Sequence, residues 1–358
     1  MKSGKISVNV LKRSVFKQIR AKREEVVNGA GMGADCAVFT FADGDMTVSC
    51  IQEAPVAVQE DSAFLREAAE IAQEAGGAES SGKSGNNFAE RRTMAQLIQK
   101  CANNLAAKGA EPVAVLITLL LPENTEEPDI KKLMAEADGA CQELHMQIAG
   151  GQTRVTTAVK VPCGVVTGIG KISKETHHRL RGAAPGQDVV ISKWIGLEGT
   201  SLLARQYGEL LSERLPVYFV EEAAGFGRLL SVVPEAATAV KSGVCAMHDV
   251  SEGGIFGALW ELAEGAGVGL TIDLKKLPLR QETVEVCECC NVNPYELLSG
   301  GCLLMTCEDG SALVSALRAE GIAAVTVGKV TDSNDRILVN EDEVRYLDRP
   351  KVDQIYGG

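Results

Sequence analysis

Strand-like and helix-like stretches alternate along this chain, and that alternation restricts the fold more than any other feature. The run PVAVLITLLLP (112–122) is continuously apolar and reads as a buried strand. A helix with acidic residues at its front is expected over 125–146, followed by a strand over 147–149. Because the second half repeats this pattern and closes on a hairpin, the sequence predicts an α/β (α+β) protein.

The length of 358 residues exceeds the roughly 150 residues that one domain usually holds, so two domains are expected. The stretch RGAAPGQD (181–188) has the glycines and proline of a junction before a new strand. We therefore divide the chain near residue 175, into domains 1–175 and 176–358. Within the first domain, periodicity predicts a helix over 61–75 and a Gly/Ser-rich loop over 76–87.

Charge and composition exclude several classes of protein. The net charge of −12 argues against a nucleic-acid partner, and no apolar run reaches the ~20 residues of a membrane span. The basic N-terminus lacks the apolar core of a secretory signal. Eleven scattered cysteines indicate free thiols in a reducing cytoplasm. The cluster Cys287, Cys289 and Cys290 has no second ligand pair, which favours a helix with partly buried thiols over a zinc site.

A glycine-rich stretch, GAGMGADCAVFTF (29–41), leads into a predicted strand. Gly31 and Gly33 would let the backbone approach a ligand and expose its N–H groups. Asp35 stands at the strand entrance, where a carboxylate could hold Mg²⁺ bound to phosphates. The alternative is a glycine-rich turn with Asp35 as a turn residue, and the spacing leaves both interpretations open.

The stretch GGQTRV (150–155) follows the strand predicted at 147–149 and is interpreted as a loop. Its glycines permit close backbone approach, and its polar side chains could contact a phosphate; an ordinary loop is the alternative. The candidate residues are Gly150, Gly151, Gln152 and Thr153.

Asn103 and Asn104 lie in the middle of a helix predicted over 91–108. Asparagine has a poor helix propensity, so this local cost suggests that the amides face something polar. Solvent-facing amides are the alternative.

The stretch HDVSEGG (248–254) precedes a helix. Asp249 or Ser251 can cap that helix, with Glu252 in its first turn. Capping does not explain Gly253 and Gly254, since each glycine costs about 1 kcal/mol in a helix interior. Exposed N–H groups at a helix start form an anion site, so we favour a ligand-facing helix start over a structural cap.

His248 directly precedes this helix start and could serve as an acid–base group. With Asp249 and Glu252 it forms the candidate catalytic set.

Four motifs in this order, GADCAV, NNLAAKGAEP, GGQTRV and HDVSEGGIFGALWELAEGAGVGLTID, resemble the superfamily of aminoimidazole ribonucleotide (AIR) synthetase. That superfamily includes the hydrogenase-maturation protein HypE, thiamine-monophosphate kinase, selenophosphate synthetase and formylglycinamidine synthetase. The resemblance covers nearly the whole chain. GKISVNVLKRSVF and SKWIGLEGTSLLA are most similar to the HypE-like branch, often named AIR synthase-related protein.

The resemblance implies a ferredoxin-like, PurM N-terminal-like domain that dimerises, followed by a PurM C-terminal-like domain. It also implies an insert near 56–92, because that segment is about 30 residues longer than usual in the family. Members bind ATP and Mg²⁺ in a cleft at the dimer interface and activate an amide or carbamoyl oxygen by phosphorylating it.

Several departures from the family pattern weaken the implied Mg²⁺ site. Asp35 matches one expected acid, but amides stand where acids are usual at Asn103–Asn104 and at Gln152. An amide is a neutral and weaker Mg²⁺ ligand, so a degenerate metal site is expected. The printed sequence also ends in QIYGG, without the cysteine on which HypE carries its thiocarboxamide.

The leading hypothesis is a homodimeric, cytoplasmic, HypE- or PurM-like enzyme or maturation factor that uses ATP on a carbonyl or carbamoyl oxygen. Asp35 would bind the metal and residues 150–153 the phosphates, while His248, Asp249, Gly253 and Gly254 would face the substrate, a nucleotide or phosphorylated small molecule. One alternative is a non-catalytic dimeric scaffold or ligand-binding protein that has lost Mg²⁺–ATP chemistry. Another is AIR synthetase of purine biosynthesis. The sequence names neither the substrate nor a protein partner.

Overall fold

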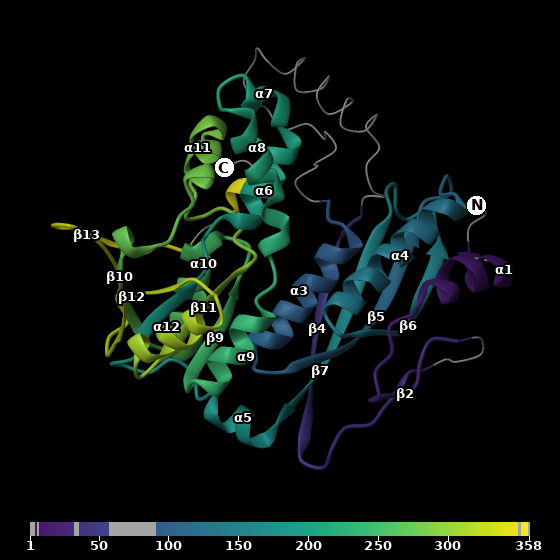
Figure 1. Ribbon diagram of the computed structural model, residues 1–358, viewed down its shortest axis with the longest axis horizontal. Coiled ribbons are helices and arrows are strands. Elements are labelled where there is room, and N and C mark those ends of the chain that lie inside the picture. Colours follow the sequence, from purple (N-terminus) through teal and green to yellow (C-terminus); the bar gives the residue numbers. More distant parts are fainter. Residues whose placement is uncertain (1–3, 6, 32–35, 57–90, 350–351, 357–358) are drawn as a thin grey trace. The chain divides into compact units, whose positions relative to one another are not determined.

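The computed structural model describes residues 4–5, 7–31, 36–56, 91–349 and 352–356. The chain forms two compact units (Figure 1). The N-terminal unit comprises Met1–Leu105 and Ala110–Ser173, and the C-terminal unit comprises Ala106–Gly109 and Lys174–Gly358. Within the described ranges, no helix has both the length and the apolar character needed to cross a bilayer.

The N-terminal unit is built on a five-stranded sheet in the order β1-β6-β5-β7-β4, in which β5 and β6 run parallel. Its described elements are β1 Gly4–Lys5, α1 Val8–Val10, short helical turns at Leu11–Val15 and Phe16–Gln18, β2 Val26–Asn28, β3 Val38–Phe39, β4 Asp45–Pro55, α3 Met94–Ala107, β5 Glu111–Leu121, α4 Glu127–Glu143, β6 Gln147–Val155 and β7 Cys163–Ser173.

Helices α3 and α4 cover one face of this sheet (Figure 1). Close packing of α3 requires small residues on β7: a Cβ at Gly164 would lie 3.1 Å from Leu97, and one at Gly168 would lie 3.2 Å from Leu105. A two-stranded hairpin, β2–β3, packs Val26 and Phe39 against the sheet residues Val113, Ala114, Ala149 and Leu116.

One face of the sheet is turned away from α3. The part of that face that the hairpin does not cover is called the open face. Cross-strand pairing puts Thr118 opposite both Gln152 and Val165, and Val165 opposite Glu53. Ile51 belongs to the same face because it lies two residues before Glu53, and its side chain is 63% exposed. Helices α3 and α4 lie on the other face (Figure 1), so within the described part of the chain no helix covers these residues.

The two ends of the predicted insert lie beside each other. Val56 and Arg92 form a parallel bridge, and the Arg92 N–H donates to the Pro55 carbonyl at 2.9 Å. The helix predicted over 61–75 and the loop over 76–87 lie outside the described residues.

The C-terminal unit is built on a seven-stranded sheet in the order β14-β13-β10-β12-β8-β11-β9. Its elements are α5 Lys174–Arg179, β8 Asp188–Ser192, α6 Leu197–Gln206, α7 Gly208–Ser212, α8 Val217–Ala224, α9 Val233–Lys241, β9 Val244–Val250, α10 Gly254–Ala266, β10 Gly269–Asp273, α11 Gln281–Cys290, β11 Cys302–Cys307, α12 Gly310–Ala319, β12 Ala324–Thr331, β13 Arg336–Asn340 and β14 Glu343–Tyr346, with short 3-10 turns at Gly225–Leu229, Leu274–Lys276 and Gln354–Tyr356.

Apolar side chains alternate between the two faces of this sheet, so both faces carry helices. Ile255 and Leu259 of α10 pack with Val250 and Leu304 on one face. On the other face, helices α9 and α12 pack against Met247, Leu303 and Met305. The sheet is thus the middle layer of a three-layer unit, with β9 at its edge.

Candidate functional site

The GGQTRV stretch is part of a strand, and its interpretation as a loop was wrong. Strand β6 continues to Val155 and pairs with β5 throughout. Gly151 has a φ of +142°, and a Cβ there would lie only 1.8 Å from the Ile117 carbonyl oxygen. Gly151 therefore admits the backbone of β5, which is a structural requirement independent of any ligand.

Gln152 and Thr153 point to opposite faces of the sheet, as neighbours in a strand must. Gln152 is exposed on the open face, across from Thr118. Thr153 is only 7% exposed and pairs with Leu119, which is fully buried. Of the two, Gln152 is the one that the described structure leaves accessible to a ligand.

Asn103 and Asn104 lie in helix α3, as predicted, but close to its C-terminal end and not in its middle. Asn103 is 2% exposed, and its side-chain oxygen accepts a hydrogen bond from Gln99 Nε2 at 2.8 Å, one turn earlier in the helix. Asn104 is half-buried. Helix α3 covers the face opposite Gln152, so the structure does not bring these amides and Gln152 together on one side of the sheet.

Gly31 is half-buried, and a Cβ there would meet no atom of the described residues within 4 Å. Packing against the described residues therefore does not require this glycine. Gly33 and Asp35 lie outside the described residues, so the predicted metal ligand stays a prediction. Within the described part of the chain, no group of three or more His, Cys, Asp or Glu side chains could hold a metal ion. The amides at Asn103, Asn104 and Gln152 thus do not belong to a described carboxylate site for Mg²⁺.

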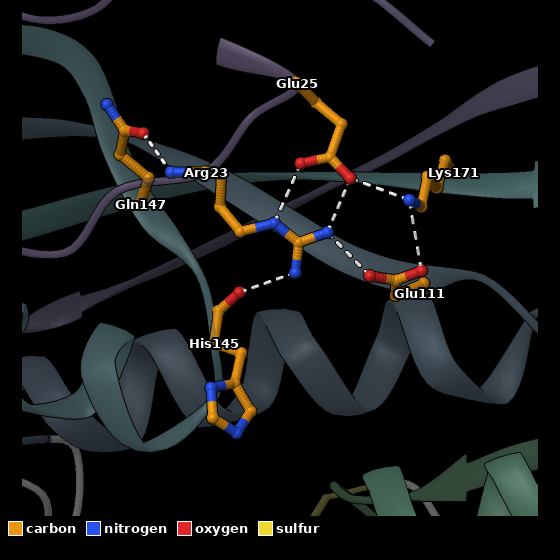
Figure 2. A network of polar contacts seen from close by, with 6 residues as sticks. All are labelled: Arg23, Glu25, Glu111, His145, Gln147 and Lys171. Carbon is orange, nitrogen blue, oxygen red and sulfur yellow. Dashed lines mark hydrogen bonds and ion pairs between the residues drawn. The ribbon is translucent and has the colours of Figure 1, made fainter. Parts of the chain in front are cut away.

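Sequence reasoning missed a polar network that holds the segment before the glycine-rich stretch (Figure 2). Arg23 contacts both oxygens of Glu25, at 2.6 and 2.9 Å, and Glu111 at 2.6 Å. Lys171 lies 2.6 Å from Glu25 and 3.3 Å from Glu111. The Arg23 N–H also donates to the Gln147 side chain at 2.6 Å.

This network joins the chain before β2 to the ends of three strands of the sheet. Glu111 begins β5, Gln147 begins β6 and Lys171 lies near the end of β7. The hydrogen bond from Arg23 lowers the pKa of Glu25 to about 2, against the opposing effect of burial. The network therefore holds the chain at residues 23–25, directly before strand β2.

His248 and Asp249 belong to strand β9, so they do not lie in the first turn of the helix. They point to opposite faces of the strand. His248 Nδ1 lies 2.8 Å from the Asp249 backbone oxygen, and Nε2 lies 3.3 Å from Glu261 of α10. The Asp249 side chain is buried, with 7% exposure. This geometry does not make His248 and Asp249 an acid–base pair.

Neither Asp249 nor Ser251 caps helix α10, so that prediction was wrong. The N-cap is Gly253, which has a φ of +78° and provides no side-chain cap. Gly254 also has a positive φ, +61°, and a Cβ there would lie 2.5 Å from the Tyr295 carbonyl oxygen. Gly254 is required because the backbone at 295–297 fills the place of its Cβ, and Gly253 suits its left-handed φ.

The sequence predicted exposed N–H groups at the start of this helix, and that prediction was wrong because several of them donate hydrogen bonds within the chain. The Gly253 N–H donates to Asp353 Oδ2 at 2.7 Å. Gly254 donates to the Ser251 carbonyl and Phe256 to the Tyr295 carbonyl, both at 3.1 Å. The chain thus supplies its own acceptors at the predicted anion site.

Asp353 is the residue that sequence reasoning missed here. Its Oδ1 also accepts hydrogen bonds from the Leu298 N–H at 3.1 Å and the Ile355 N–H at 2.8 Å. The side chain is 5% exposed, and burial raises its pKa while the three N–H donors oppose that shift. A carboxylate held by three backbone donors shows that this position accepts an anion.

The remaining catalytic candidate, Glu252, is exposed, and its Oε1 accepts a hydrogen bond from the Tyr356 hydroxyl at 3.2 Å. Glu252 and Asp353 together fasten the segment 353–356 to the start of α10. That segment therefore covers the helix end that the sequence assigned to the substrate side.

The described cavities do not coincide with the candidate residues. Three cavities of about 250, 430 and 450 Å³ are lined by none of the residues predicted for catalysis or cofactor binding. Cys287, Cys289 and Cys290 lie on α11, and burial raises the pKa of Cys287 to about 12 and that of Cys290 to about 11. Such protonated thiols suit the structural interpretation of that cluster.

Comparison with known proteins matches both units to one family. The N-terminal domain model of AIR synthase related protein matches residues 85–172, and the C-terminal domain model matches residues 184–340. A putative hydrogenase expression/formation protein of Methanocaldococcus jannaschii is 26% identical over 259 residues, which cover 71% of this chain and 75% of that protein.

The carbamoyl dehydratase HypE of Rhodobacter capsulatus is 29% identical over 233 residues, which cover 63% of this chain and 66% of that protein. A crystal structure of HypE in complex with ATP superposes with a TM-score of 0.71, covering 97% of this chain and 96% of that one at 16% identity. At that identity the likeness shows a shared fold. The predicted fold class, two PurM-like domains in a mixed α/β chain, is confirmed, and the chain belongs to the AIR synthase-related superfamily of PurM- and HypE-like proteins.

Proposed function

We propose that this chain is an ATP-dependent, HypE-like maturation enzyme that activates a carbonyl or carbamoyl oxygen by phosphorylating it. The observation that carries the proposal is the similarity to a carbamoyl dehydratase HypE across parts of both domains. Its relatives named for hydrogenase formation favour this function over AIR synthesis in purine metabolism. The fold shared with the ATP complex of HypE supports ATP as the phosphoryl donor.

The proposed nucleotide contacts lie in the N-terminal unit. Gly31, Gly33 and Asp35 would approach the phosphates, with Gly150, Gly151 and Gln152 at strand β6. Gln152 is exposed, and no atom of the described residues fills the place of a Cβ at Gly31, which supports their access to a ligand. Because amides replace acids at Asn103, Asn104 and Gln152, we propose that Mg²⁺ binding is weak and that the metal site is degenerate.

We also propose that the protein is a homodimer and that the open face forms its interface. Ile51 on this face is 63% exposed and lies between polar neighbours. The partly exposed Val165 and Thr118 belong to the same face. All eleven cysteines are free thiols, which supports a cytoplasmic location.

The test is calorimetry of ATP binding with and without Mg²⁺. For the proposed function, wild-type protein binds ATP, and Gln152→Asp or Asn104→Asp tightens the Mg²⁺-dependent part, because a carboxylate is the better ligand. Asn334→Asp makes the same chemical change at an exposed loop position and serves as the matched control. Absence of heat at millimolar ATP in all four proteins rejects the proposal.

A second candidate function is a non-catalytic dimeric ligand-binding or scaffold protein that has lost Mg²⁺–ATP chemistry. The observation that favours it is Asp353, whose carboxylate occupies the helix start assigned to the substrate. This candidate predicts that ATP binding is absent or independent of Mg²⁺ in every variant. Turnover of ATP to ADP by the wild-type protein would exclude it.

A further inference from the structure

Two cysteines that are far apart in the sequence meet in the N-terminal unit. Cys50 lies on strand β4 and Cys101 on helix α3, on the helix-covered side of the sheet. The Cys50 thiol donates to the Cys101 carbonyl oxygen at 3.4 Å, and the Cys101 thiol donates to the Val166 carbonyl oxygen at 3.3 Å.

The sheet makes room for this pair by omitting one side chain. Gly168 of β7 is the cross-strand partner of Cys50. A Cβ at Gly168 would lie 3.0 Å from the Cys50 sulfur and 3.1 Å from the Cys101 Cβ. The glycine therefore leaves both sulfur-bearing side chains directly against the sheet and against each other.

The two thiols are chemically unequal. Cys101 is fully buried, whereas Cys50 is half-buried, so Cys50 is the more accessible of the two. The neighbouring Cys101 side chain lowers the pKa of Cys50, against the opposing effect of burial, and the Cys50 side chain together with burial raises the pKa of Cys101. Because the thiolate is the nucleophile, Cys50 is the thiol that attacks first.

We propose that Cys50 and Cys101 form a redox modification site, a reversible dithiol–disulfide couple that exchanges with low-molecular-weight disulfides of the glutathione type. The Cys50 thiolate attacks one sulfur of oxidised glutathione, its S–S bond breaks, and the first glutathione leaves as a thiolate that takes up a proton. The Cys101 thiol then loses its proton and attacks the Cys50 sulfur, releasing the second glutathione. Two protein thiols are oxidised and one small disulfide is reduced to two thiols.

The product would link edge strand β4 to helix α3 covalently, two residues before Asn103. Cys50 faces α3 and not the open face, so this site is independent of the proposed dimer. Cys141, a fully buried thiol on α4, lacks a described thiol neighbour and gives a matched comparison.

The experiment equilibrates the full-length chain with mixtures of reduced and oxidised glutathione, blocks free thiols with an alkylating agent and maps the peptides. The expected product is one Cys50–Cys101 cross-link, with the count of free thiols falling by two from eleven. Cys101→Ser should stop the reaction at a glutathione adduct on Cys50. Cys50→Ser should leave Cys101 unmodified, and Cys141→Ser should behave as wild type.

The wild-type map alone decides the proposal, so a variant that folds poorly does not weaken the test. Circular dichroism of each variant before oxidation identifies such cases. The proposal is overturned if other cysteines oxidise while Cys50 and Cys101 stay reduced, or if Cys50 cross-links to a different residue.

Discussion

At the scale of single residues, Glu25 shows how one carboxylate fixes a segment of chain. Arg23 lowers the pKa of Glu25 to about 2, whereas the pKa of a glutamate in the unfolded chain is about 4.3. The folded state therefore binds fewer protons in that interval. The stabilisation from Glu25 is complete above the unfolded value and is lost as the pH falls toward 2.

We predict that Glu25→Gln lowers the free energy of unfolding at pH 7 by about 1–3 kcal/mol, since charged hydrogen bonds to Arg23 and Lys171 are lost. The variant should also lose less stability than wild type between pH 5 and pH 2. Urea unfolding over a pH series measures both effects. Glu24→Gln removes an exposed charge from the adjacent position and should change little. Equal losses in the two variants would contradict the assigned role.

Asp353 is the second residue with a specific role, because one carboxylate accepts three backbone hydrogen bonds. We predict that Asp353→Asn speeds amide hydrogen exchange at Gly253, Leu298 and Ile355 by roughly tenfold or more, because hydrogen bonds to a charged group contribute about 1.5–3 kcal/mol. Exchange followed by NMR resolves the three amides.

Asp348→Asn alters an exposed carboxylate in the same C-terminal segment and is the matched control. Unchanged exchange at the three amides in Asp353→Asn would show that the carboxylate does not hold them.

These residue-level contacts could not be predicted from the sequence. The Arg23–Glu111 pair spans 88 positions, Lys171–Glu25 spans 146, and Gly253–Asp353 spans 100. Periodicity and capping rules describe neighbours within a turn or a strand, so they contain no information on contacts of this range. Asp353 also stands in a short polar segment without a motif.

At the scale of secondary structure, the sequence located the elements well where apolar runs were continuous. The run at 112–122 is β5, Glu111–Leu121, and the helix expected over 125–146 is α4, Glu127–Glu143. The errors occurred at glycines. GGQTRV suggested a ligand loop and HDVSEGG a ligand-facing helix start, yet Gly151 and Gly254 serve close approaches of the protein's own backbone. A glycine in the sequence shows that a side chain is absent, but it does not show whether a ligand or the protein's own backbone occupies the space.

Strand β6 offers a direct test of this explanation. We predict that Gly151→Ala destabilises the protein by about 3 kcal/mol or more, because its Cβ would overlap the Ile117 carbonyl oxygen in a backbone conformation that L-residues rarely adopt. Gly150→Ala is the neighbouring control, since its Cβ would meet only the Leu116 side chain at 3.3 Å, and it should cost far less. Thermal unfolding compares the two, and similar losses would reject the backbone explanation.

At the scale of the whole molecule, the order of four motifs identified a two-domain family, and the comparisons confirmed that fold. The same motifs did not define one assembled site. Asn103 belongs to helix α3, which covers one face of the sheet, and Gln152 lies on the other face. Asp35 lies outside the described residues. The order of the four motifs constrains the topology because the motifs span the chain. A site depends on the direction of each side chain, and a shift of one residue along a strand reverses that direction.

The uncovered sheet face leads to a prediction about assembly. If the open face pairs two copies, a twofold interface buries Ile51 of each, and burial of one such side chain contributes about 1.5–3 kcal/mol. We predict that Ile51→Glu raises the Kd of the dimer by roughly a hundredfold or more, since each 1.4 kcal/mol is about tenfold and the change occurs twice.

Analytical ultracentrifugation over a concentration series measures this Kd, and circular dichroism confirms that the variant folds. Val344 on β14 is equally exposed, at 63%, and lies in the other unit. Val344→Glu therefore makes the same kind of change away from the open face and should leave the Kd unchanged. A wild-type chain that stays monomeric at micromolar concentrations, or a Val344→Glu variant that dissociates as readily as Ile51→Glu, would place the interface elsewhere. Dissociation of Ile51→Glu alone, with loss of ATP binding, would tie the nucleotide site to the paired sheets.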